Sequence, residues 1–208
     1  MHMTLNRFVM IAVALLLAAA PLGGQSRSDE RAARREAAAA AKTLRREGFK
    51  PIELGDVRTR LEKYFLKVGA GCAQVIGVAE NCMSTNLAQV TALSNAATQY
   101  ALLSGGEIRG RILSSTTSLT GQQVDNIVSS FERLVEKNIR GELVPYVTAI
   151  RERRGRITAR VYCIVDLDTA SRLRRQALEI ALEEQALASR YGSMVSDWID
   201  EGFAKGGE

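Results

Sequence analysis

Residues 157–167, with the sequence ITARVYCIVDL, decide the fold class of this chain. Apolar side chains occupy every second position, and mostly polar ones lie between them. An alternation with a period of two predicts a β-strand with one buried face. The predicted buried side is Ile157, Ala159, Val161, Cys163, Val165 and Leu167, and the opposite side is Thr158, Arg160, Tyr162 and Asp166.

A second strand is predicted just upstream, over residues 143–150. The turn signal Arg153, Arg154, Gly155 lies between the two runs. Two strands joined by a short Gly-containing segment are typical of a β-hairpin. We therefore expect these residues to form an antiparallel pair.

Two amphipathic helices are predicted over residues 84–103 and 122–139, where apolar side chains recur with the helical period. In the first helix Ala88, Ala92 and Ala96 lie on a face adjoining the apolar side, which allows a neighbouring element to approach closely. Gly105 and Gly106 are predicted to end this helix. The predicted apolar side of the first helix is Leu87, Val90, Leu93, Ala97, Tyr100 and Leu103.

Two further strands are predicted, over residues 74–79 and 108–118, the latter because it is dense in Ser and Thr. The resulting order β-α-β-α-β-β-α predicts an α+β fold with one sheet of about four strands covered by helices. The closing helix is expected within residues 169–203, with an apolar stripe that reaches Trp198. This stripe suits packing on its own domain or on a partner helix.

The N-terminal part of the chain is predicted to be helical. Residues 28–47 form an Ala-rich helix with few large side chains to bury, so we expect it to dock weakly. Residues 49–52 look extended, and residues 56–67 form a short amphipathic helix. The predicted organisation is a signal peptide (1–24), an N-terminal helical segment (25–72), an α+β core domain (73–168), and a C-terminal helix and tail (169–208).

Residues 8–22 are a short apolar run after Arg7, closed by Gly23 and Gly24, which is the layout of a secretory signal peptide. The run is shorter than the ~20 apolar residues of a membrane span. Cleavage before Gln25 would lower the net charge from +5 to +4, and would remove His2, the single histidine. Imidazole-based catalysis and metal binding would then be excluded. We expect a periplasmic protein without a lipidated Cys and without an integral membrane span.

Three cysteines, Cys72, Cys82 and Cys163, follow in a compartment that favours disulfides. Cys163 is predicted to be a small buried hydrophobe in its strand. A strand between Cys72 and Cys82 would hold their Cα atoms beyond disulfide reach, so strand and bridge compete. We favour the strand.

No complete catalytic or cofactor motif was found. Gly69 and Gly71 begin a G-x-G, but position 74 is Gln74 and the pair follows a helix, so a dinucleotide site is not expected. Asp166 and Asp168 could hold a cation, but a helix cap at Asp168 explains them better, because a metal site needs more ligands. No cofactor or metal is expected.

The candidate site is a cluster of arginines at the predicted hairpin turn, formed by Arg151, Arg153, Arg154 and Arg156. Clustered guanidinium groups bind phosphate or carboxylate groups in bidentate fashion. An anionic glycan, a lipid surface or another envelope protein would fit this charge. A solvated turn that keeps the protein soluble is the simpler alternative. Nucleic acid is not expected, since export, modest charge and the lack of interleaved aromatics count against it.

Five segments carry a resemblance to known proteins: Arg46 to Lys50, Val75 to Gly77, Ala88 to Leu103, Ile108 to Ser118 and Ile157 to Asp166. In these segments the chain resembles a group of uncharacterised exported proteins of Gram-negative gut bacteria, distantly similar to the twenty-kilodalton outer-membrane lipoprotein family. The resemblance implies an α+β fold and an envelope location, but no activity and no catalytic residues.

Two functions stay open at this point. The first is a non-enzymatic interaction or structural protein of the periplasm or outer membrane. The alternative is an envelope enzyme that uses carboxylate or Lys chemistry without histidine.

Overall fold

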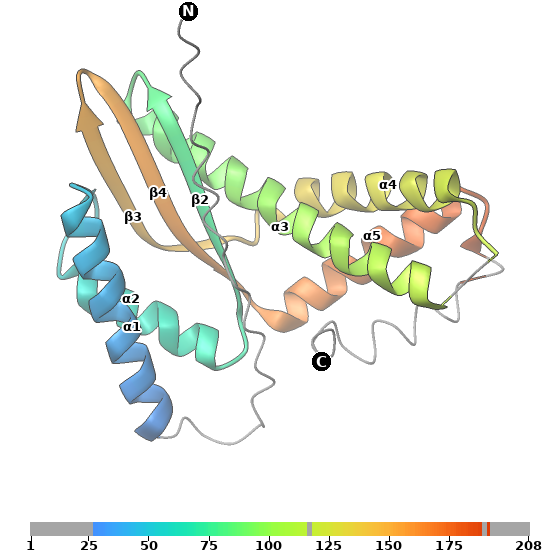
Figure 1. The fold of residues 1–208 in the computed structure, drawn as a ribbon, viewed down its shortest axis with the longest axis horizontal. Helices are drawn as coiled ribbons and strands as arrows, with labels where there is room; N and C mark the ends of the chain where they lie inside the picture. The colour runs from blue at the N-terminus through green and yellow to red at the C-terminus, as the bar shows by residue number, and fades with distance from the viewer. Residues whose placement is uncertain (1–26, 116–117, 189–190, 192–208) are drawn as a thin grey trace, which may run out of the picture.

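The computed structural model describes residues 27–115, 118–188 and 191. The predicted signal peptide and the end of the predicted C-terminal helix, including Trp198, lie outside these residues. The described elements are α1 (Arg27–Arg46), β1 (Lys50–Pro51), α2 (Val57–Gly69), β2 (Ala73–Cys82), α3 (Thr85–Ser115), α4 (Gly121–Ile139), β3 (Val144–Arg153), β4 (Arg156–Val165) and α5 (Leu167–Glu184). Figure 1 shows their arrangement.

The strands form one antiparallel sheet in the order β1-β3-β4-β2. The α+β class and the count of about four strands are therefore confirmed. The predicted order β-α-β-α-β-β-α is wrong, because residues 108–115 belong to α3 and the fourth strand is the two-residue β1. The residues of β4 were expected to bury one face only, and this is wrong. Tyr162 and Ile164 on the other side are also buried, because α2 packs against β3 and β4 there.

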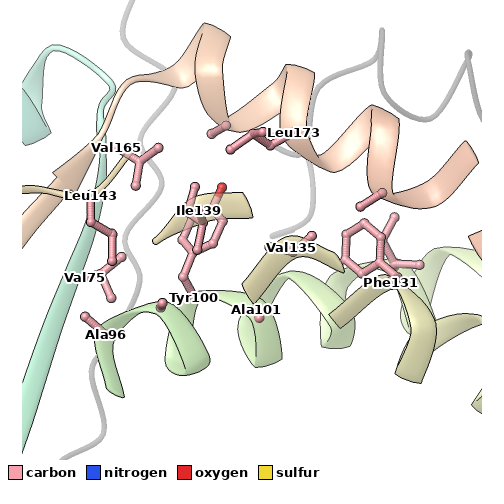
Figure 2. Packing of buried hydrophobic residues seen from close by; sticks show 14 of the residues in the cluster. Val75, Ala96, Tyr100, Ala101, Phe131, Val135, Ile139, Leu143, Val165 and Leu173 are labelled. Atoms are coloured by element: carbon pink, nitrogen blue, oxygen red, sulfur yellow. The ribbon is translucent and has the colours of Figure 1, made fainter. Parts of the chain in front are cut away.

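One face of the sheet is covered by α3, which packs on β2 and β4 and continues beyond the sheet alongside α4, while α5 packs on α4 (Figure 1). Figure 2 shows the centre of this core, where Val75 and Val165 of the sheet lie close to Ala96 and Tyr100 of α3. The opposite face carries a second core that contains Leu61, Tyr64 and Tyr162. The Tyr64 ring meets the Tyr162 ring edge to face at 5.7 Å.

The strand predicted over residues 108–118 is wrong, because α3 runs unbroken from Thr85 to Ser115. Gly105 and Gly106 lie inside this helix and do not end it. A Cβ at Gly105 would lie 2.1 Å from the Glu132 carboxylate of α4, so a side chain here would have to displace that of Glu132. Ile108 and Ile112, expected on a strand, are buried in the helical core.

The buried side of α3 agrees with the prediction at Ala97 and Tyr100, which are buried, and differs from it elsewhere. Leu87, Val90 and Leu103 are exposed, and the face of Ala88, Ala92 and Ala96 is buried instead. A Cβ at Gly77 of β2 would lie 1.9 Å from the Ala92 carbonyl oxygen. The expected close approach is therefore present, and it explains why the small side chains face the sheet.

The N-terminal helix lies against α2. Ala33, Ala37 and Leu44 of α1 are buried, and α1 packs on α2. An ion pair of 2.8 Å joins Arg34 to Glu62 of α2. Small side chains allow α1 to pack closely on α2, and the strength of this docking stays a prediction from the sequence.

The N-cap of α5 is Asp166, which accepts hydrogen bonds from the backbone of Asp168 and Thr169, so the expected cap at Asp168 is wrong. The strand over residues 74–79 is confirmed within β2, and Cys72, Cys82 and Cys163 are free thiols. Cys163 is buried as expected.

Candidate functional site

The β3–β4 hairpin places the arginines at one end of the sheet. Arg153 and Arg156 are the last paired residues of the two strands. Arg154 and Gly155 between them have φ values of +52° and +70°. Two consecutive positive φ values are typical of a type I′ turn, whose twist matches that of the flanking strands. The predicted hairpin is therefore confirmed, with a two-residue turn.

Arg153, Arg154 and Arg156 lie beside Asn81, and together they line a hollow of about 630 Å³. We call these four residues the Arg tip. Asn81 comes from the end of β2, where the pairing with β4 shifts between Ala79 and Cys82. Its φ of +59° is in the left-handed region, which Asn tolerates better than most residues. The bulge thus brings an amide side chain to the hairpin tip.

The charge of the Arg tip is not compensated inside the part of the chain that the structure describes. Within the described ranges, no ion pair involves Arg153, Arg154 or Arg156. Several other arginines in these ranges do form ion pairs. Glu152 is close in sequence, but strand alternation puts it on the opposite face of the hairpin from Arg153. Arg156 donates instead to the Met83 sulfur, a weak acceptor.

Arg151 does not belong to the Arg tip, contrary to the prediction from the sequence. It is half-buried, and its guanidinium lies 4.9 Å from the centre of the Phe49 ring. Its Nη1 donates to the Glu47 carbonyl oxygen at 3.4 Å. Arg160 stacks on the same ring at 4.8 Å and pairs with the Glu47 carboxylate at 2.9 Å. Arg151 therefore helps to hold the start of the sheet around Phe49.

Sequence reasoning missed Asn81 and Met83 as neighbours of the arginines. Both follow the apolar part of β2, and nothing local indicates that they reach a hairpin some 70 residues further along the chain. The sequence did contain one local signal for a bulge. The polar residues Glu80 and Asn81 follow directly after the apolar part of the predicted strand.

The carboxylates and thiols of the described residues occupy other environments. Glu107 pairs with Arg174 at 3.2 Å between α3 and α5, and burial raises the pKa of its carboxyl group. Burial also raises the pKa of the Cys72 thiol, and it raises that of Cys163 to about 12. Reactive thiols need the opposite shift. Within the described ranges, no group of three or more His, Cys, Asp or Glu side chains could hold a metal ion.

None of the helices described by the structure is both long and apolar enough to cross a membrane. The described residues thus define an α+β domain with helices on both faces of its sheet and an uncompensated basic hairpin tip. Comparison of the chain with family models, with curated proteins and with solved structures found no match. The resemblance to envelope proteins stays a prediction from the sequence.

Proposed function

We propose that this chain is an exported, non-enzymatic interaction protein of the bacterial envelope, and that its Arg tip binds an anionic surface of phosphorylated or carboxylated lipid or glycan head groups. The observation that carries this proposal is the hollow between three arginines that no described carboxylate neutralises. Planar guanidinium groups suit such anions, because each one offers two parallel N–H donors.

The rigidity of the hairpin supports this role. The two strands stay paired up to Arg153 and Arg156, so the two guanidinium groups emerge from neighbouring positions on one face. A type I′ turn adds little freedom between them. Binding would therefore order fewer side-chain and backbone torsions than on a flexible basic tail.

The location is the second part of the proposal and rests on the apolar run at residues 8–22. We expect the exported protein to start near Gln25. Terminal sequencing of the protein from an envelope fraction tests this, and an intact Met1 in washed membranes would contradict it.

Cosedimentation with lipid vesicles tests the site. The triple variant Arg153→Gln, Arg154→Asn, Arg156→Gln should lose binding to phosphatidylglycerol vesicles. The matched control Arg31→Gln, Arg35→Gln, Arg45→Gln removes the same charge from exposed positions of α1 and should keep binding. Binding of the unchanged chain should weaken as salt approaches physiological strength, where the Debye length falls to about 8 Å.

Phosphatidylcholine vesicles provide the lipid control, and inorganic phosphate as competitor distinguishes recognition of the phosphate group from recognition of a whole surface. Both variants should unfold at nearly the same denaturant concentration as the unchanged chain, since exposed substitutions rarely change stability by more than about 0.5 kcal/mol. Equal binding by the two triple variants would show that the Arg tip is only a solvated turn.

A further inference from the structure

The Arg tip has a strongly exposed apolar neighbour. Arg156 donates to the sulfur of Met83, and Met83 exposes 70% of its surface. Met83 follows Cys82 of β2, which pairs with Ile157 of β4, so the backbones of Met83 and Arg156 are level at the end of the sheet. An apolar thioether and the basic hairpin therefore occupy the same end of the sheet.

The start of α3 continues this surface with two further apolar side chains. The helix begins two residues after Met83, and Leu87 and Val90 in its first two turns expose 50% and 61% of their surface. Residues three apart lie on the same side of a helix, so Leu87 and Val90 share one face. Figure 1 shows the start of α3 at the same end of the sheet as the β3–β4 hairpin.

The start of α3 brings no charge to this surface. Residues 81–106 contain no charged side chain, in a chain that is 25% charged. Glu80 and Glu152 are the carboxylates closest in sequence, and among the described residues neither forms an ion pair with an arginine of the Arg tip. The surface is thus basic at the hairpin, and uncharged and partly apolar along the first turns of α3.

Such a surface fits a lipid bilayer better than it fits a glycan. Proteins that lie in a membrane interface bury apolar side chains among the lipids, while their basic side chains attract anionic head groups. A glycan or a free phosphate is fully hydrated and offers only the charge, so Met83, Leu87 and Val90 would stay exposed to water. A protein partner would need an apolar patch shaped to these side chains, whereas a fluid bilayer adapts to them.

We propose that the occupant of this surface is an anionic lipid bilayer, with the arginines of the Arg tip on the lipid phosphates and Met83 and Leu87 inserted between the head groups. This choice of a bilayer rests on the proposed function, and it narrows lipid or glycan head groups to lipid. Insertion adds a contribution that salt does not screen, because the transfer of apolar surface out of water does not depend on charge. Salt therefore weakens the attachment of the chain without releasing it.

Cosedimentation with phosphatidylglycerol vesicles at physiological salt tests the insertion. The variant Met83→Gln, Leu87→Gln keeps every charge and should lower vesicle binding on the order of tenfold, the loss expected when two partly inserted apolar side chains become polar. The matched control Leu54→Gln, Leu113→Gln changes two exposed leucines outside this surface and should bind as the unchanged chain does. Thermal unfolding of both variants shows that the fold is kept.

A tryptophan at the site reports the depth of insertion directly. The variant Met83→Trp, Trp198→Phe contains a single tryptophan, whose emission should shift to the blue and be quenched by brominated phosphatidylglycerol. Leu113→Trp, Trp198→Phe is its control and should remain unquenched. The tryptophan measurement decides the question if Met83→Gln, Leu87→Gln does not fold.

The two sets of variants separate insertion from the binding of head groups. Vesicle binding that the triple arginine variant loses and Met83→Gln, Leu87→Gln keeps would leave the proposed function intact and overturn insertion. Vesicle binding that survives the arginine changes would contradict the proposed function, and with it the choice of a bilayer. Glycerol phosphate carries the head-group charge without acyl chains, and release of the bound chain by glycerol phosphate at the lipid concentration would show recognition of free phosphate alone. Binding of a soluble acidic protein, with no binding of vesicles, would likewise overturn the proposal.

Discussion

Gly77 is the residue on which the contact between β2 and α3 depends. The closest helix atom to a Cβ at this position would be the Ala92 carbonyl oxygen, at 1.9 Å, and the Ala96 side chain would be 2.9 Å away. Backbone atoms cannot rotate out of the way as a long side chain can. Any larger residue here must therefore move the helix or the strand.

We predict that Gly77→Ala lowers the free energy of unfolding by about 1–3 kcal/mol or more, as overpacking does in other cores. Gly106→Ala is the control, because no atom lies within 4 Å of a Cβ there and alanine stabilises a helix interior by roughly 0.5–1 kcal/mol. Urea denaturation measures both. Two variants of equal stability would contradict the packing described for α3.

At the scale of elements, α1 is attached by few but well-buried contacts. Leu44 is buried next to Phe49 at the end of the helix, and Glu47 just beyond it pairs with Arg160 of β4. The helix therefore reaches the sheet through its last turn and contacts α2 through its alanines. A helix with few large side chains can still be a fixed part of the fold.

Leu44→Ala should accordingly destabilise the protein by about 2–5 kcal/mol, the usual cost of truncating a buried leucine. Leu54→Ala is its control, since Leu54 is 93% exposed, and this change should stay within about 0.5 kcal/mol. The midpoint of denaturant unfolding gives both values. A Leu44→Ala variant as stable as Leu54→Ala would show that α1 is loosely attached.

At the scale of the whole molecule, the buried tyrosines and thiols make stability depend on alkaline pH. Burial raises the pKa of Tyr64, Tyr100 and Tyr162, and it raises the pKa of Cys163 to about 12. Each of these groups is neutral in the folded state at a pH where the unfolded chain already ionises. Their contribution is complete below the unfolded pKa and is lost as pH rises through the folded pKa.

We therefore predict a free energy of unfolding that falls steadily above about pH 8.5, where an unfolded thiol begins to ionise. Cys163→Ala should reduce the slope of this fall, whatever its effect at neutral pH. Urea denaturation in reducing buffer at a series of pH values measures the slope. Unchanged stability up to the ordinary tyrosine pKa of about 10 would contradict the burial of these groups.

Several elements were predictable because their signals are local. The alternation in residues 157–167 predicted β4, the Arg and Gly turn predicted the hairpin, and the apolar period of residues 122–139 predicted α4. In α4 the predicted apolar residues Val124, Ile127 and Phe131 are indeed buried. Strand and helix periods are properties of neighbouring residues, so no distant contact is needed to recognise them.

Tertiary packing decided the rest. Residues 108–115 have a strand-like composition, yet they continue α3 because Ile108 and Ile112 are buried against the neighbouring helices. Hydropathy favoured Leu87, Val90 and Leu103 of α3 as part of its buried face, but where β2 lies closest to the helix, at Gly77, the facing residue is Ala92. The Arg tip was visible as a run of charge, while the position of Arg151 on Phe49 and of Asn81 beside the hairpin depends on residues far away in the chain. A local pattern shows which faces of a helix or strand are apolar and which are polar. Only the neighbouring elements determine which of these faces is buried.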